Sequence, residues 1–433
     1  MTPTAYLEAR LPLQEDPLLL MARLVRSGLF DPYMVYESGT GWSLAGGILT
    51  SVRLSGREAK DLSTVAAQLA AVPVADWRAY GWAAFELGAA LTGGDLADTG
   101  TLLYLVVPRD EVRVDATGVV VRSLDPERLQ ALTCRVREGD AEPPPEPADR
   151  ITLPLQDTGN YRAAVAAALL ELRGPGPLEK VILSRRLPVP TEVDLVASYV
   201  VGRRANTPAR SFLLDLGGIQ AAGFSPETVA EVTADGQVTT RPLAGTRART
   251  GTPAADARLR AELLGDPKEI HEHAISVKLA LEDLSAVSDA PVVGEYMTVL
   301  DRGTVQHLAS TVTGRLRPGQ GPWDVFAALF PAVTATGIPK TPAYPLIRAL
   351  EGGPRGLYAG AALTCDADGT LDAALVLRTV FRRDGQCWLQ AGAGIVRQSR
   401  PEREHEETCE KLRSVASCLV PAAAGPARRT PEV

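Results

Sequence analysis

Cysteine and histidine are scarce in this chain of 433 residues. It holds five cysteines, an odd number, and no two of them form a C-x-x-C pair. A disulfide framework or a zinc ribbon is therefore not expected. Four histidines are present, and none stands in the H-E-x-x-H pattern of a zinc protease.

An excess of positive charge is also missing. The 52 Asp and Glu residues outnumber the 45 Lys and Arg residues, which gives a formal net charge of -7. A general nucleic-acid binder would carry a basic excess, so we expect no nucleic-acid partner. A small anionic substrate is compatible with this balance, because local fields differ from net charge.

No long apolar run is present either. The most apolar stretch, residues 163–170, is far too short to cross a bilayer. Residues 1–10 lack the basic region and the apolar stretch of a signal peptide. We therefore expect a cytoplasmic protein with no membrane contact. Residues 421–433 are small, basic and proline-containing, and we expect them to form a disordered tail.

What the chain does have is an ordinary globular composition, 45% hydrophobic and 22% charged. Such a chain can bury a large core and is not disordered as a whole. Its length alone suggests two or three domains. The clearest linker is residues 139–150, where prolines forbid a helix interior or a central strand.

Hydrophobic periodicity predicts many strands and a few long helices. Strands are expected at residues 102–107, 111–123 (with a turn at 115–118), 181–187, 211–216, 228–233, 238–241, 373–381 and 387–391. Helices are expected at residues 161–172, 266–287 and 402–419. Asp235 and Gly236 predict a hairpin turn. Because strands turn back without regular helical crossovers, the pattern indicates an α+β protein with mainly antiparallel sheets flanked by helices.

Two of the predicted helices carry paired acidic residues. Glu269 and Glu272 lie three positions apart in the first helix. Glu404, Glu407 and Lys411 lie at positions i, i+3 and i+7 in the second. Each set shares one stripe of its helix. A solvated helix face is the plain interpretation, but two such pairs from distant segments could converge on a hard cation such as magnesium.

Lys180 and Glu227 are the candidate base and acid. Lys180 opens a predicted strand, and its plain interpretation is a solvated strand end. A lysine partly desolvated there could lose its proton and act as a base. Glu227 follows a Ser-Pro pair at a strand entrance, where the plain interpretation is an exposed turn acid. An acid and a base on opposite sides of a pocket suit an addition–elimination reaction.

Four further residues are candidates for a binding site. Arg378 lies inside the apolar strand predicted at 373–381, where an unpaired guanidinium is costly. It needs a structural salt bridge or a substrate carboxylate held in a bidentate manner. Gly392 and Gly394 end another predicted strand, either as a plain turn or as free backbone N–H groups for a carboxylate. His307 is either a satisfied core group or part of the site.

Nine short segments, in this order, resemble the chorismate-utilising enzymes: anthranilate synthase large subunits, isochorismate synthases and salicylate synthases. The segments are KVILSR at 180–185, SPE at 225–227, PLAGTR at 242–247, KEIHEH at 268–273, QHLAST at 306–311, TGIPK at 336–340, PRGLYAG at 354–360, AGAGIV at 391–396 and EETCEKL at 406–412. They cover roughly residues 160–420, whereas residues 1–150 match loosely, best at 80–86. Residues 330–340 and 401–412 look most like bacterial salicylate synthases of siderophore pathways.

The resemblance implies a role for each candidate. Lys180 looks like the base that activates water for attack at C2 of chorismate, and Glu227 like the acid that protonates the departing C4 hydroxyl. The implied cofactor is Mg²⁺. Its implied ligands are Glu272 and Glu407, with Glu269 and Glu404 holding metal-bound waters.

The resemblance also implies which residues hold the substrate. They are Thr334, Tyr358, Arg378, Gly392, Gly394 and Lys411. Arg378, Tyr358 and the backbone at Gly394 would hold the enolpyruvyl carboxylate. Thr334 and the catalytic His307 would line the ring.

The choice within the family depends on few positions. Aminating members resemble one another in carrying a non-basic residue at the position of Lys180 and an Arg-Asn-Asp-Leu run after the first acidic helix. Here that run is absent from residues 279–284, which favours water over ammonia. We therefore expect a monomeric salicylate synthase that converts chorismate through isochorismate, without a glutaminase subunit. The alternatives are an isochorismate synthase, an anthranilate or aminodeoxychorismate synthase-like subunit, and a non-catalytic binding relative.

The family fold implies one large domain over residues 1–420, with two mainly antiparallel sheets packed together and flanked by helices. Under this hypothesis the proline-rich residues 139–150 are a surface connection instead of a domain boundary.

Overall fold

The computed structural model describes residues 5–94, 100–139, 150–157, 160–303 and 305–422. Two large antiparallel sheets and a small one form its framework. The first sheet has the order β1 (Leu7–Leu11), β8 (Gly118–Ser123), β7 (Asp110–Asp115), β3 (Gly41–Gly46), β2 (Tyr33–Ser38), β10 (Arg210–Leu216), β11 (Ile219–Ser225), β22 (Thr379–Arg383), β23 (Gln386–Val396), β9 (Lys180–Val189) and β19 (Gly337–Ile338).

The second large sheet packs against the first. Its order is β15 (Ser288–Val293), β18 (Val312–Leu316), β13 (Gln237–Thr240), β12 (Thr228–Val232), β21 (Leu371–Leu375), β20 (Ala361–Asp366), β5 (Arg78–Ala83), β6 (Thr101–Val107) and β4 (Thr50–Ser55). The small sheet has the order β14 (Leu243–Ala248), β17 (Val305–Ala309) and β16 (Thr298–Arg302). The predicted α+β fold with two antiparallel sheets is confirmed, and the third sheet is an addition to it.

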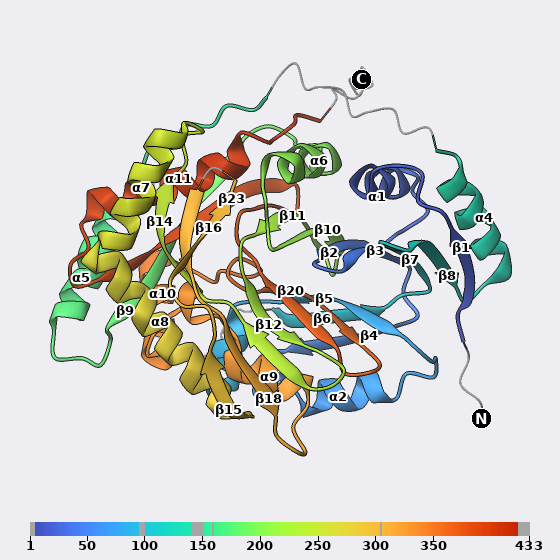
Figure 1. Ribbon diagram of the computed structural model, residues 1–433, viewed down its shortest axis with the longest axis horizontal. Coiled ribbons are helices and arrows are strands. Elements are labelled where there is room, and N and C mark those ends of the chain that lie inside the picture. The colour runs from blue at the N-terminus through green and yellow to red at the C-terminus, as the bar shows by residue number, and fades with distance from the viewer. Residues whose placement is uncertain (1–4, 95–99, 140–149, 158–159, 304, 423–433) are drawn as a thin grey trace, which may run out of the picture.

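Helices cover both outer faces of this sandwich (Figure 1). They are α1 (Pro17–Arg26), α2 (Ser63–Ala70), α3 (Glu86–Leu91), α4 (Pro126–Arg137), α5 (Tyr161–Arg173), α6 (Leu195–Ala205), α7 (Pro253–Gly265), α8 (Pro267–Ser285), α9 (Pro322–Leu329), α10 (Lys340–Glu351) and α11 (Pro401–Ala416), with short 3-10 turns η1 (Gly56–Lys60) and η2 (Val333–Ala335). Helices α1 and α6 lie over the first sheet, and α2 and α9 lie under the second. None of the helices in the described ranges is long and apolar enough to cross a membrane.

The alternation of side chains along β2 explains the two cores. Met34 and Tyr36 point into the large core between the sheets, which also contains Trp82 of β5. Val35, between them, points to the second core under α1 and α6. Successive strand residues face opposite sides, so a strand that is buried on both faces separates two apolar layers. The first sheet is therefore buried on both sides.

The N-terminal strands belong to both large sheets. β2 pairs with β10, and β5 pairs with β20, so strands from before residue 139 are built into the same sheets as strands from after residue 180. Residues 140–149 of the predicted connection lie outside the described residues, and so do residues 423–433 of the predicted tail. The N–H of Ala422 donates to the backbone carbonyl of Glu192 at 2.9 Å.

Many predicted elements are confirmed. The turn at 115–118 joins β7 to β8, and Asp235-Gly236 joins β12 to β13. The predicted helices correspond to α5, α8 and α11.

Two predictions were wrong. The strand at 373–381 is interrupted: β21 ends at Leu375 in the second sheet, and β22 begins at Thr379 in the first. Arg378 lies in this crossing with φ +49° and is not inside a strand. Gly392 and Gly394 do not end a strand, because β23 continues through both as far as Val396. The uniform apolar pattern hid the crossing, since both sheets bury their residues.

Candidate active site

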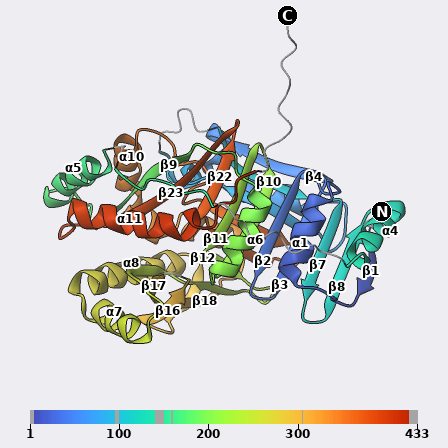
Figure 2. The ribbon, with the colours of Figure 1, turned by 90° about the horizontal axis from the view of Figure 1, so that it is seen from above.

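A pocket opens beside β9, β22 and β23, between α11 and the small sheet. Figure 2 shows α8 and α11 lying one above the other at this end of the molecule, far from α1 and α4. The predicted site residues that line it are Glu227, Glu272, His307, Thr334, Tyr358, Arg378, Gly392, Gly394, Glu407 and Lys411. The other three, Lys180, Glu269 and Glu404, pair with charged groups beside it.

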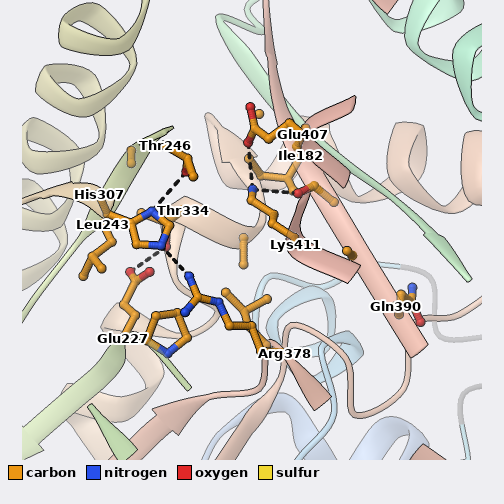
Figure 3. A pocket seen from close by; sticks show the side chains of 18 of the residues that line it. Ile182, Glu227, Leu243, Thr246, His307, Thr334, Arg378, Gln390, Glu407 and Lys411 are labelled. Atoms are coloured by element: carbon orange, nitrogen blue, oxygen red, sulfur yellow. Dashed lines mark hydrogen bonds and ion pairs between the residues drawn. The ribbon is translucent and has the colours of Figure 1, made fainter. Parts of the chain in front are cut away.

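Glu227 is a buried acid in the short connection between β11 and β12. The hydroxyl of Thr334 in η2 donates to its Oε1 at 2.6 Å (Figure 3). Burial raises the pKa of Glu227 to about 8, against the lowering effect of this hydrogen bond and of the more distant Lys180 and Lys411. At neutral pH the carboxyl is therefore mostly protonated and able to donate a proton.

Lys180 is fully buried at the start of β9. Its Nζ lies 3.0 Å from Oε1 of Glu272 and 3.1 Å from Oγ of Ser276, one turn further along α8. Gly394 on β23 faces this pair, and a Cβ there would lie 3.1 Å from Cε of Lys180 and would collide with Glu272. Glycine is required at this position because only a bare backbone leaves room for both side chains. The predicted base is thus not a solvated strand end.

Arg378 carries a buried guanidinium that forms no ion pair with any carboxylate in the part of the chain that the structure describes. It donates to the carbonyl of Arg302 at 3.1 Å and to Nε2 of His307. Burial, and then the nearby Arg302, lower its pKa to about 9. A buried cation without a counter-ion is costly unless an anion binds beside it. Among the described residues, the structural salt bridge considered from the sequence is absent, which favours the other interpretation.

His307 on β17 is held between Arg378 and Thr246 (Figure 3). Guanidinium groups can only donate, so Nε2 of His307 accepts and Nδ1 carries the proton. Oγ1 of Thr246 lies 3.0 Å from Nδ1. Burial, followed by the charges of Arg378 and Lys411, holds the pKa of His307 well below its usual range. The imidazole is therefore neutral and orients the guanidinium.

Four buried carboxylates of α8 and α11 lie near one another across the two helices. They are Glu269, Glu272, Glu404 and Glu407. Nζ of Lys268 lies 3.1 Å from Oε1 of Glu404 and 3.7 Å from Oε1 of Glu269. Nζ of Lys411 lies 2.8 Å from Oε1 of Glu407. The solvated faces considered from the sequence are therefore excluded for both acidic stripes.

Electrostatics shifts the pKa values of the two carboxyl groups of α11, Glu404 and Glu407, in opposite directions. Burial and then the neighbouring Glu407 raise the pKa of Glu404. Burial also acts to raise the pKa of Glu407, but Lys411 and Lys268 outweigh it and lower that pKa. Oε2 of Glu404 is buried and forms no hydrogen bond within the geometric limits with any described residue. Within the described ranges, no three His, Cys, Asp or Glu side chains stand in metal-binding geometry.

Lys411 and Tyr358 complete the wall around β23. Lys411 donates to the carbonyl of Gly392 at 2.8 Å as well as to Glu407. Tyr358 is buried, and a Cβ at Gly392 would lie 3.1 Å from its hydroxyl. Side chains from α11 and from the segment before β20 thus meet over the glycines of β23.

Three residues of the site were missed by the sequence argument. Thr246 and Lys268 lie within the segments that carry the resemblance, but they received no role. Ser276 lies one helical turn after Glu272, and this spacing on the same stripe is a signal that could have identified it.

Comparisons with known proteins identify the family of the chain. The family model of chorismate binding enzymes matches residues 31–417. A salicylate synthase of Mycolicibacterium paratuberculosis is 41% identical over 434 residues, which cover 95% of each chain. An anthranilate synthase component 1 of Methanothermobacter thermautotrophicus is 41% identical over 246 residues, 56% of this chain and 53% of the relative.

Solved structures show the same fold. The menaquinone-specific isochorismate synthase of Escherichia coli superposes with a TM-score of 0.75 at 23% identity, covering 96% of each chain. Anthranilate synthase component I of Streptococcus pneumoniae gives a TM-score of 0.71 at 26% identity, over 89% of this chain and 91% of the other. The resemblance inferred from the nine segments is confirmed: this chain belongs to the chorismate binding enzymes.

Proposed function

We propose that the protein is a magnesium-dependent salicylate synthase, which converts chorismate to isochorismate and then to salicylate and pyruvate. The observation that carries the proposal is the 41% identity to a salicylate synthase over 95% of both chains. The pocket supports it, because a protonated buried acid and a buried arginine line one cavity, and a buried lysine lies beside it. Among the described residues, the arginine forms no ion pair with a carboxylate.

The first step replaces one hydroxyl by another. Lys180 takes a proton from water as the water oxygen bonds to C2 of the ring, and Glu227 gives a proton to the C4 hydroxyl, which leaves as water. The high pKa of Glu227 suits this role, because the group is protonated at neutral pH. A protonated lysine cannot accept a proton, so Lys180 must first give up the proton that it shares with Glu272 in their ion pair.

The second step needs orientation more than further acids or bases. The hydrogen on C2 of isochorismate moves to the methylene carbon of the enolpyruvyl group while the ether bond at C3 breaks, which leaves salicylate and pyruvate. Arg378 would hold the enolpyruvyl carboxylate, and His307 keeps the guanidinium in place. A fixed carboxylate restricts the side chain to the conformation that reacts.

The donor set of α8 and α11 fits magnesium. Its members are all carboxylates, the ligands that this cation prefers, and Oε2 of Glu404 is a buried oxygen without a hydrogen-bond partner among the described residues. We propose Glu272 and Glu407 as ligands, with Glu269 and Glu404 holding coordinated waters. A magnesium ion bound there would neutralise the ring carboxylate of the substrate.

Product analysis tests the proposal. Purified protein is incubated with chorismate and Mg²⁺, and the products are separated by chromatography. We expect salicylate and pyruvate in equal amounts, with isochorismate only as a transient. Isochorismate that accumulates without salicylate would refute the second step. Anthranilate formed from added ammonia would refute water as the nucleophile and the absence of a glutaminase partner.

Lys180→Ala separates the two steps. Because only water addition needs the base, the variant should lose turnover of chorismate and keep measurable release of pyruvate from supplied isochorismate. A variant that retains both activities would show that Lys180 is not the base.

A further inference from the structure

None of the described residues before Ile182 lines the pocket, yet one carboxylate of this part of the chain bonds to the loop beside it. Glu86 is buried at the start of α3, directly after β5, which lies next to β20 (Figure 1). Its Oε1 accepts the backbone N–H of Arg355 at 2.7 Å, and its Oε2 accepts that of Gly356 at 3.1 Å. The N–H of Phe85 donates back to the carbonyl of Gly356 at 2.8 Å.

This loop fixes the buried guanidinium of Arg355. Its Nε and Nη2 donate to the two carboxylate oxygens of Glu351, at 2.9 and 2.6 Å. Nη1 donates to the carbonyl of Ala335 at 2.7 Å, and Nη2 also donates to the carbonyl of Ile182 at 2.8 Å. The guanidinium carbon lies 4.4 Å from the centre of the Phe85 ring. One side chain thus joins α10, η2 and β9.

Two of these bonds end on the wall of the pocket. Ala335 and Ile182 both line it. Ala335 directly follows Thr334, the hydroxyl of which donates to Glu227. Ile182 lies two residues after Lys180 on β9. The place of the Thr334 hydroxyl relative to Glu227 therefore depends on where Arg355 holds the backbone of η2.

We propose that Glu86 and Arg355 are positioning residues for the proposed reaction: Glu86 fixes the backbone of Arg355, and Arg355 holds η2 so that Thr334 stays bonded to Glu227. The inference deepens the proposed function and gives a role to the N-terminal segment 80–86. A planar guanidinium reaches a carboxylate and two carbonyls at once, whereas a single ammonium cannot.

Arg355→Lys and Glu86→Gln test the proposal. Both keep the approximate volume, and Gln can still accept one of the two N–H groups. A looser η2 should lower kcat for chorismate by about ten- to a hundredfold in Arg355→Lys, because small displacements at a reacting group are costly. KM should change much less, since neither residue touches the pocket. Glu86→Gln should show the same pattern more weakly.

The pH dependence separates positioning from a general loss of stability. Losing the Thr334 bond raises the pKa of Glu227. The alkaline limb of the pH profile of kcat/KM should therefore move to higher pH in Arg355→Lys, as we also expect for Thr334→Val. Lys180 and Lys411, the charges that face Glu227, are unchanged in both variants. The double variant should show no further shift, because both changes remove the same bond. Two outcomes would overturn the proposal: a shift in the double variant equal to the sum of the single shifts, or an alkaline limb in Arg355→Lys that stays at its original pH.

Arg122→Lys is the matched control. Arg122 is an equally buried arginine that pairs with Glu111 at 2.8 Å, and it lies on β8, away from the pocket. This variant should lose about as much thermal stability as Arg355→Lys. It should keep the kcat of the unmodified enzyme and the position of the alkaline limb of its kcat/KM profile. If it shifts the limb as Arg355→Lys does, the effect is one of stability alone and the proposal fails.

A measurement without turnover keeps the inference independent of the proposed function. The titration of Glu227 is followed in the substrate-free protein by carbon-13 NMR of glutamate carboxyl groups, assigned with Glu227→Gln. A higher pKa in Arg355→Lys supports positioning even if chorismate proves not to be the substrate. An unchanged titration refutes positioning even if salicylate is formed.

Discussion

The hydrogen bond from Thr334 to Glu227 lowers the upper pH limit of the proposed reaction, which burial of Glu227 raises. Thr334→Val removes the hydroxyl and keeps the shape of the side chain. The bond of 2.6 Å stabilises mainly the ionised carboxylate, because a hydroxyl donates more strongly to a charged acceptor. Without it, the proton should be held more tightly by Glu227.

The size of the effect follows from ordinary energies. A hydrogen bond to a charged group contributes about 1.5–3 kcal/mol, and each pKa unit corresponds to about 1.4 kcal/mol. Starting from a pKa of about 8, the loss should therefore raise the pKa of Glu227 by about one to two units. The active form of Glu227 is the protonated one, so activity falls as the pH rises through this pKa. The variant should keep its activity to a higher pH.

The assay is the pH profile of kcat/KM for chorismate, because this ratio reports the ionisation of the free enzyme. Thr334→Ser keeps the hydroxyl and is the control, with an alkaline limb near that of the unmodified enzyme. The height of the plateau can change in either variant without affecting the test. A limb that stays in place in Thr334→Val, or moves to lower pH, would refute the assignment of Glu227 as the acid.

Three further changes test other parts of the site. Glu272→Gln should weaken Mg²⁺ binding measured by calorimetry, because an amide is a poorer ligand for a hard cation; Glu282→Gln, on an exposed position of the same helix, should not. Arg378→Lys should raise KM for chorismate by about ten- to a hundredfold with a smaller change in kcat, since the bidentate grip on the carboxylate is lost; an unchanged KM would exclude this contact. Glu227→Gln should abolish turnover. The free energy of unfolding in urea, taken as variant minus unmodified enzyme, should be more favourable to the variant at pH 9 than at pH 5, by up to about 4 kcal/mol. The sign follows from the raised pKa of Glu227, whose contribution to stability is complete below its ordinary pKa of 4.5 and is lost as the pH rises through about 8. Equal stability differences at the two pH values would contradict that pKa.

The sequence by itself determined the elements whose signals are local. The acidic stripes on α8 and α11 follow from helical periodicity, and the hairpins β7–β8 and β12–β13 follow from their turn residues and alternation. Such signals act over a few residues, so they survive without knowledge of the rest of the chain. The candidate acid, base and carboxylates could be named in the same way, because their short segments carry the resemblance.

Only the tertiary structure decided which groups meet. His307 accepts from Arg378, 71 positions away, and Glu86 bonds to a loop 269 positions away. The crossing at Arg378 and the bare backbone at Gly394 were also invisible in the sequence, since they depend on which sheet and which side chains lie opposite. Contacts between distant segments are set by sheet topology and by competition for buried space, and neither leaves a local pattern. Chemistry was therefore readable residue by residue, whereas the arrangement that positions it required the fold.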